Sequence, residues 1–228
     1  MKSKPTVIIF DFDQTLVDLF QDKNWFKVLR KRIFEHYTKY LKPEKSFDEY
    51  TDENYCPYEQ WIEVICETYS AEDAESINKV AEDIVLHFER EVVDSVEYFS
   101  DVHKTLKELQ CRGIKMGIAS NNGIGTINYS LAKENLTELI SAVSGRRFPF
   151  HVRDEKPNPF YLLEVKDKIA SDGDVIWYVG DRPTDVQAAL SAGMIPIGVA
   201  TGMFTKEDLE KAGATIVLDK LSSILNYL

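Results

Sequence analysis

The chain has 228 residues, of which 44% are hydrophobic and 29% charged, and its net charge at pH 7 is −11. This composition supports a buried core and excludes a collagen-like or wholly disordered chain. The acidic balance disfavours nucleic acid or an anionic membrane surface as a partner. No apolar run reaches the roughly 18 residues of a membrane span or resembles a signal peptide. With three cysteines and no CxxC pair, we expect a cytoplasmic protein that binds neither nucleic acid nor membrane.

Short apolar runs alternate with helical patterns over most of the chain. The first run, Val7–Phe10, precedes an acidic stretch, and similar runs follow at 115–119, 175–179, 195–199 and 215–218. Helical patterns lie near 101–111, 125–135, 158–170, 184–192 and 205–212. Apolar runs of this length are typical of strands buried on both faces of a parallel sheet. The alternation predicts an α/β fold with a doubly wound, Rossmann-like parallel sheet covered by helices on both faces.

The segment between the first two predicted strands has a different composition. All eleven glycines lie at or after Gly113. The earlier segment repeats apolar residues at steps of three and four, beginning with Trp25 and Phe26, and Pro43 fits the end of its first helix. We therefore predict an α/β core domain formed by residues 1–17 and 97–228, with an all-helical cap domain, residues 18–96, inserted into it.

Polar residues follow several of the predicted strands. In open parallel sheets, ligands bind at the carboxyl ends of the strands, so these residues are the candidates for chemistry. The candidates are Asp11, Asp13, Thr15, Ser120, Asn121, Lys156, Asp181 and Asp185.

Four of these candidates are carboxylates that would meet at one edge of the sheet: Asp11, Asp13, Asp181 and Asp185. Such a group stays ionised only if a cation offsets its charge, and oxygen ligands without His or Cys favour Mg²⁺. Lys156 and the Ser120 hydroxyl, with Asn121, would bind a phosphate at the same edge. Taken singly, each residue is explained by a turn, a helix cap or a solvated lysine. The combination favours a phosphate site.

A basic stretch precedes Lys156 and contains Arg146, Arg147 and Arg153. We interpret it as a solvated loop, with contact to an anionic substrate as the alternative.

The ordered motifs resemble those of the haloacid dehalogenase-like hydrolase superfamily. Asp11-x-Asp13-x-Thr15 is similar to its first motif, Ser120 to the second, Lys156 before Pro157 to the third, and Gly180-Asp181-x-x-x-Asp185 to the fourth. The helical insert resembles the cap of the phosphoglycolate phosphatase and β-phosphoglucomutase branch. Gln14 is a departure, because many relatives have glycine there.

The resemblance implies a role for each candidate. Asp11 would attack phosphorus and form an aspartyl-phosphate. Asp13 would act as general acid and base, with its backbone carbonyl on the metal, and Thr15 would orient it. Ser120, Asn121 and Lys156 would hold the phosphoryl oxygens. Asp181 and Asp185 would complete the Mg²⁺ site.

The implied activity is the hydrolysis of a small phosphorylated metabolite. Two alternatives stay open: a phosphomutase, in which Asp11 returns the phosphoryl group to a sugar, and a non-enzymatic phospho-acceptor or binding module. The sequence predicts neither the individual substrate nor the oligomeric state.

Overall fold

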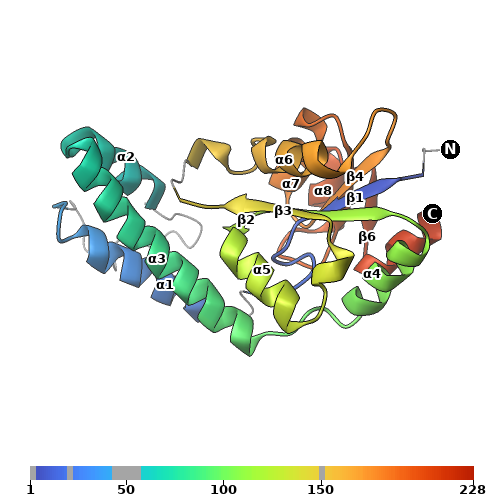
Figure 1. The fold of residues 1–228 in the computed structure, drawn as a ribbon, viewed down its shortest axis with the longest axis horizontal. Coiled ribbons are helices and arrows are strands. Elements are labelled where there is room, and N and C mark those ends of the chain that lie inside the picture. The colour runs from blue at the N-terminus through green and yellow to red at the C-terminus, as the bar shows by residue number, and fades with distance from the viewer. Residues whose placement is uncertain (1–3, 20–22, 43–57, 149–151) are drawn as a thin grey trace.

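A six-stranded parallel sheet forms the centre of the molecule (Figure 1). The computed structural model describes residues 4–19, 23–42, 58–148 and 152–228. The strands are β1 (Val7–Phe10), β2 (Lys115–Gly123), β3 (Ala142–Arg146), β4 (Ile176–Gly180), β5 (Ile195–Val199) and β6 (Ile216–Leu218). Their order across the sheet is β3-β2-β1-β4-β5-β6, and every neighbouring pair is parallel. The order reverses at β1, which is where ligands bind in sheets of this kind.

Helices cover both faces of the sheet, as the alternation predicts. The helices outside the insert are α4 (Val102–Cys111), α5 (Ile124–Lys133), α6 (Phe160–Ile169), α7 (Pro183–Ser191) and α8 (Lys206–Ala212), with short 3₁₀ turns at η2 (Thr137–Leu139), η3 (Val152–Asp154) and η4 (Leu221–Tyr227). Alternate residues of β1 enter two different clusters, Val7 and Ile9 on the α6–α7 side, and Ile8 and Phe10 on the α4–α5 side. Both faces of β1 are therefore buried, and the predicted fold class is confirmed.

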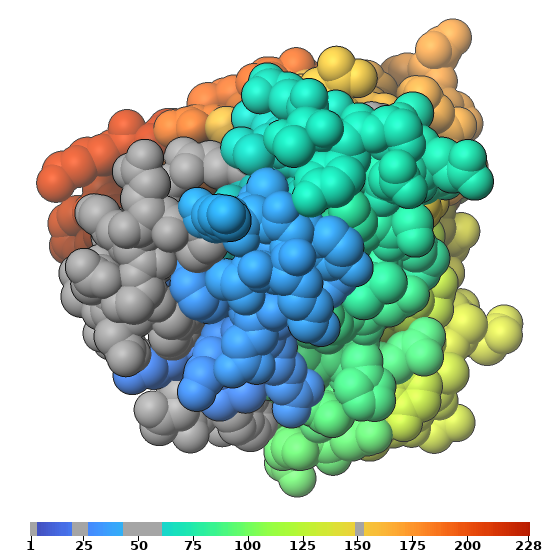
Figure 2. All heavy atoms as spheres, turned by 90° about the vertical axis from the view of Figure 1, so that its left-hand side faces the viewer, coloured from blue at the N-terminus to red at the C-terminus, as the bar shows by residue number. Residues whose placement is uncertain are grey.

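Four helices lie between β1 and β2 in the described part of the chain. α4 belongs to the core, and the other three form the insert: α1 (Lys23–Tyr37), α2 (Tyr58–Thr68) and α3 (Ala71–Ser95). The hydroxyl of Ser70 caps α3 by accepting a hydrogen bond from the backbone N–H of Asp73 at 3.2 Å. α1 and α2 both pack against α3. Figure 2 views the molecule from this end, with α1 at the front. The side chains of Trp25 and Phe26, and the predicted helix end at Pro43, lie outside the described residues.

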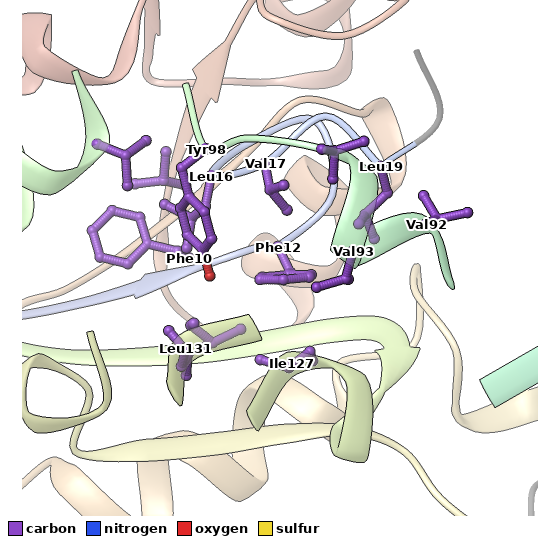
Figure 3. Packing of buried hydrophobic residues seen from close by; sticks show 14 of the residues in the cluster. Phe10, Phe12, Leu16, Val17, Leu19, Val92, Val93, Tyr98, Ile127 and Leu131 are labelled. Carbon is purple, nitrogen blue, oxygen red and sulfur yellow. The ribbon is translucent and has the colours of Figure 1, made fainter. Parts of the chain in front are cut away.

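The C-terminal half of α3 packs on the core, although it belongs to the insert in the chain. Figure 3 shows Val93 of α3 beside Phe12, and Ile127 of α5 below the Phe12 ring. Phe12 is fully buried, and it separates Asp11 from Asp13 in the chain. The loop that carries both carboxylates is therefore anchored by apolar contacts with α3 and α5.

One strand was absent from the sequence-based prediction. Residues 142–146 form β3 at the edge of the sheet, beside β2. The segment reads Ala-Val-Ser-Gly-Arg, so it lacks the apolar run that identifies the other strands.

Candidate active site

Three buried carboxylates meet beyond the carboxyl ends of β1 and β4. β1 pairs with β4 in a register that places Phe10 opposite Val179, so Asp11 and Asp181 leave neighbouring strands at almost the same level. Asp185 lies in the first turn of α7, which follows β4. One oxygen of each carboxylate lies within 4.8 Å of the others. We call Asp11, Asp181 and Asp185, together with Lys156, the acidic cluster.

Asp181 is the least satisfied member of the acidic cluster. Within the described part of the chain, neither of its oxygens has a hydrogen-bond partner, although the side chain is fully buried. Burial, followed by the charges of Asp185 and Asp11, raises the pKa of Asp181 to about 8. Buried oxygens without donors are costly unless a ligand binds them. Grouped carboxylate oxygens without sulfur or imidazole fit a hard divalent cation such as Mg²⁺.

Lys156 supplies the positive charge inside the acidic cluster. Its Nζ lies 2.6 Å from an oxygen of Asp11 and 2.6 Å from an oxygen of Asp185. Burial alone would lower the pKa of Lys156, but the charges of Asp11 and Asp185 outweigh it and raise the pKa. The ammonium therefore stays protonated and holds the two carboxylates from β1 and α7 together.

Asp185 also has a structural role. Its second carboxylate oxygen accepts the backbone N–H of Arg182 at 2.9 Å, which closes the first turn of α7. Asp185 is therefore both a helix cap and a member of the acidic cluster.

The carboxylate of Asp13 lies outside the group of three. One of its oxygens accepts the backbone N–H of Leu19 at 2.9 Å. Loss of solvent raises the pKa of Asp13 to about 7, the Leu19 hydrogen bond opposes this shift, and the charge of Asp11 adds to it. Asp13 thus has a pKa in the range of a general acid or base at neutral pH.

Ser120 and Asn121 occupy the end of β2, on the other side of β1. The buried Ser120 hydroxyl donates to the side-chain oxygen of Asn122 at 3.0 Å. The side-chain oxygen of Asn121 accepts the backbone N–H of Lys156 at 3.1 Å. Asn121 therefore joins the end of β2 to the residue that bridges the acidic cluster.

Gln14 and Thr15 belong to the turn between Asp13 and the helical insert. Gln14 has φ 59°, in the left-handed region that glycine adopts most easily. The backbone of Gln14 is held by a hydrogen bond from its N–H to the Val17 carbonyl at 2.6 Å and by the Thr201 hydroxyl, which donates to its carbonyl. The buried Thr15 hydroxyl has no hydrogen-bond partner among the residues that the structure describes.

Sequence reasoning missed Tyr178, which lies in the middle of β4. Its hydroxyl donates to the Ala119 carbonyl at 2.8 Å and accepts a hydrogen bond from Lys156 Nζ at 3.1 Å. Tyr178 therefore helps to hold the ammonium in place. The residue sits in an apolar run and gives no sequence signal beyond being a tyrosine.

Arg182 and Gly202 were missed as well, although both follow strand ends at the same edge. Burial would lower the pKa of Arg182, but the charges of Asp181 and Asp13 outweigh this effect and raise the pKa. A Cβ atom on Gly202 would lie 2.0 Å from an oxygen of Asp181. The position of Gly202 after β5 could have indicated that it lies at the site, because ligands bind at the carboxyl ends of parallel strands.

The interpretation of the basic stretch was wrong for Arg146. Its side chain is buried and forms ion pairs with Glu82 and Glu89 of α3. Arg147 pairs with Glu164 of α6 at 2.6 Å. Both acidic partners lie far from these arginines in the chain, so the local sequence does not indicate them.

A parallel sheet with buried carboxylates and a lysine at its switch point places the chain among open α/β proteins whose ligand site lies at the carboxyl ends of the strands. The chain belongs to the haloacid dehalogenase-like hydrolase family, whose model matches residues 8–199.

Individual relatives agree with this assignment. A phosphoglycolate phosphatase of Rhodospirillum rubrum is 31% identical over 123 residues, which cover 54% of this chain and 49% of that protein. The chain thus spans about half the length of the first curated relatives it matches. A haloacid dehalogenase-like hydrolase from Bacteroides fragilis has the same fold, with a TM-score of 0.70 and 22% identity over 97% of this chain and 100% of its own. A hydrolase from Pseudomonas syringae also has this fold, with a TM-score of 0.64 and 20% identity over 98% of this chain and 97% of its own.

No helix in the described ranges is both long and apolar enough to cross a membrane.

Proposed function

We propose that this protein is a magnesium-dependent phosphatase that removes phosphate from a small phosphomonoester in the cytoplasm. The observation that carries the proposal is the bridge made by Lys156, 2.6 Å from both Asp11 and Asp185, beside an Asp181 whose oxygens lack donors. This arrangement combines a nucleophile, a phosphate-binding cation and a set of ligands for a hard metal ion.

In the first step, a carboxylate oxygen of Asp11 attacks phosphorus while the bond from phosphorus to the ester oxygen breaks. Asp13 gives its proton to the departing ester oxygen, which leaves as an alcohol, and the phosphoryl group stays on Asp11. The pKa of Asp13, raised to about 7, supports this role. In the second step, Asp13 takes a proton from water, the water oxygen attacks phosphorus, and the bond to Asp11 breaks to release inorganic phosphate.

The remaining residues bind and orient. Lys156, Ser120 and Asn121 would hold the phosphoryl oxygens, and Thr15 would orient the loop that carries Asp13. Asp11, Asp181 and Asp185 would hold Mg²⁺ with the backbone carbonyl of Asp13. When bound, the ion would offset the carboxylate charge and stabilise the charge on the phosphoryl group. Residues 18–96 would act as a cap that shields the site from water.

The names of the relatives suggest the kind of substrate. Several curated relatives are phosphoglycolate phosphatases, so the class we propose is a small phosphorylated metabolite.

The test compares Asp11→Asn with Asp172→Asn, a change at an exposed aspartate in the turn before β4. Hydrolysis of p-nitrophenyl phosphate with Mg²⁺ should fall by at least about 10³-fold in Asp11→Asn, because the nucleophile is lost, and should stay unchanged in the control. Turnover by Asp11→Asn at the wild-type rate would refute the assignment of Asp11.

Two further assays separate the alternatives. Isomerisation of a sugar monophosphate in the presence of a bisphosphate primer, without release of phosphate, would indicate a phosphomutase. Stoichiometric phosphorylation of Asp11 without turnover would indicate a phospho-acceptor module.

A further inference from the structure

A second group of buried charges joins α3 to the core. Arg146, the last residue of β3, places Nε 3.0 Å from both oxygens of Glu82 and Nη2 2.8 Å from Glu89. All three side chains are at least nine-tenths buried. We call Glu82, Glu89 and Arg146 the α3 ion network.

The α3 ion network continues into the loop at the end of β2. Nη1 of Arg146 donates to the backbone carbonyl of Asn121 at 2.9 Å. The second oxygen of Glu89 accepts the backbone N–H of Gly123 at 3.1 Å and the hydroxyl of Thr126 at 2.8 Å. Helix α3 therefore holds both ends of the segment that follows Ser120.

Close packing fixes the same contact. A Cβ atom on Gly123 would lie 2.2 Å from Leu86 and 2.9 Å from the carboxylate of Glu89, so this side of α3 touches the backbone of β2 directly. α3 has no room to shift toward β2.

The contacts form one continuous path to the acidic cluster. Glu82 and Glu89 hold Arg146, Arg146 holds the carbonyl of Asn121, and the side chain of Asn121 accepts the backbone N–H of Lys156. Each link is a direct hydrogen bond or ion pair between described residues. Lys156 in turn bridges Asp11 and Asp185.

Stability alone does not explain the α3 ion network. Burying two carboxylates and a guanidinium costs desolvation energy, and apolar side chains of similar volume often stabilise a protein as well or better. The network does provide a guanidinium that reaches two carboxylates and a carbonyl at once, which no apolar residue supplies.

We propose, on the basis of the phosphatase function above, that Arg146 is a positioning residue for the phosphate-binding side of the site. Arg146, oriented by Glu82 and Glu89, fixes Asn121 and through it Lys156. The part of α3 from Glu82 to Glu89 thereby supports the Asn121 side of the active site.

The test removes the link to Asn121 by replacing all three charged side chains of the α3 ion network at once. The triple variant Glu82→Met, Glu89→Gln, Arg146→Met is neutral, and its glutamine still offers an acceptor to Gly123. We expect a melting temperature close to that of the wild type, kcat about 10–100-fold lower because Lys156 is less well placed, and a competitive inhibition constant for inorganic phosphate about tenfold higher. Arg147→Met, at the exposed neighbour, is the control and should match the wild type in all three.

Arg146→Lys provides a second variant in case the triple variant does not fold. Lysine keeps the positive charge between the two glutamates but lacks the planar fork that reaches the Asn121 carbonyl. We expect a similar rise in the inhibition constant for phosphate. A folded triple variant or Arg146→Lys with wild-type kcat and inhibition constant would overturn the proposal and leave Arg146 a purely structural residue.

Amide hydrogen exchange gives a measurement that does not require turnover. Peptides that contain Lys156 should exchange faster in the folded triple variant than in the wild type, whereas peptides from β6 should not change. Equal exchange at Lys156 would also overturn the proposal. A wild-type protein that hydrolyses no phosphate ester would refute the proposed function alone, because this exchange comparison would still report on the position of Lys156.

Discussion

The acidic cluster and the α3 ion network both bury an excess of negative charge, yet their donors are distributed differently. The acidic cluster has three carboxylates and one ammonium, a formal charge of −2, and the α3 ion network has two carboxylates and one guanidinium, a formal charge of −1. Every carboxylate oxygen of the α3 ion network accepts a hydrogen bond. In the acidic cluster, both oxygens of Asp181 lack a donor among the described residues.

Unpaired oxygens distinguish a binding site from a structural ion pair here. Both groups are buried and carry net negative charge, so neither property identifies the site. Buried oxygens without donors are rare in folded proteins because each costs the desolvation energy of the group. The acidic cluster therefore needs a ligand to satisfy its oxygens, whereas the carboxylate oxygens of the α3 ion network all accept hydrogen bonds within the protein.

The largest expected effect on stability comes from breaking the α3 ion network. Arg146→Met would remove the guanidinium that contacts both Glu82 and Glu89, and we expect the free energy of unfolding to fall by about 3–5 kcal/mol. Arg147→Met removes a half-exposed ion pair and should cost less than about 1 kcal/mol. Urea denaturation measures both. Equal losses of unfolding free energy in the two variants would mean that the α3 ion network stabilises the fold no more than a half-exposed ion pair does.

Removing one charge from the acidic cluster should raise the free energy of unfolding rather than lower it. The raised pKa of Asp181 shows that its ionised form is disfavoured in the fold, so Asp181→Asn should increase the free energy of unfolding by at least about 1 kcal/mol in EDTA. The same variant should lose the stabilisation that Mg²⁺ gives the wild type, which is about 2.7 kcal/mol at a hundredfold excess over Kd. Thermal unfolding with and without Mg²⁺ checks both, with Asp172→Asn as the control. A less stable variant in EDTA would contradict the view that Asp181 lacks a partner.

Much of the acidic cluster was predictable from the sequence. Asp11 and Asp181 follow apolar runs, and parallel strands bring their carboxyl ends to one edge, so periodicity and strand direction predict their proximity. Lys156 carries no periodic signal, and it was placed with them from its position before Pro157, to which the family resemblance added a motif. The roles assigned to these residues remain predictions that the Asp11→Asn experiment tests.

The α3 ion network was not predictable in the same way. Glu82 and Glu89 lie seven residues apart on one face of a helix in an acidic segment, where solvated carboxylates are the ordinary expectation. Their partner is 57 or more positions away and ends β3, a strand without an apolar run. Such a pairing follows from the three-dimensional packing of α3 on the core and leaves no local pattern.

A smaller effect should follow from crowding the acidic cluster through the backbone. The Cβ atom of Gly202→Ala would lie 2.0 Å from an oxygen of Asp181, so the carboxylate must move away from its present position. We expect Kd for Mg²⁺ to rise about tenfold, or about 1.4 kcal/mol, in isothermal titration calorimetry. Gly125→Ala is the matched control, because its Cβ would meet only the end of the Arg90 side chain at 3.4 Å. Unchanged Mg²⁺ affinity in Gly202→Ala would place the metal on the other side of Asp181.

The smallest effect concerns His36 in the helical insert, a buried ionisable side chain that is satisfied in its neutral form. Its Nε2 lies 2.9 Å from the Ile77 carbonyl, and burial lowers the pKa of His36 below its usual 6.5, while the hydrogen bond to Ile77 opposes the shift. Because the unfolded chain then binds the proton more readily than the fold, this contribution to stability is present above pH 6.5 and is lost as the pH falls below it. His36→Gln keeps an N–H donor for Ile77 and cannot titrate. The loss of unfolding free energy between pH 7.5 and 5.5 should therefore be smaller in His36→Gln than in the wild type, by less than about 1 kcal/mol. If His36→Gln loses as much unfolding free energy over this pH range as the wild type, His36 does not contribute to the pH dependence of stability. The comparison of satisfied and unsatisfied buried groups would then apply only to groups that are charged in the fold.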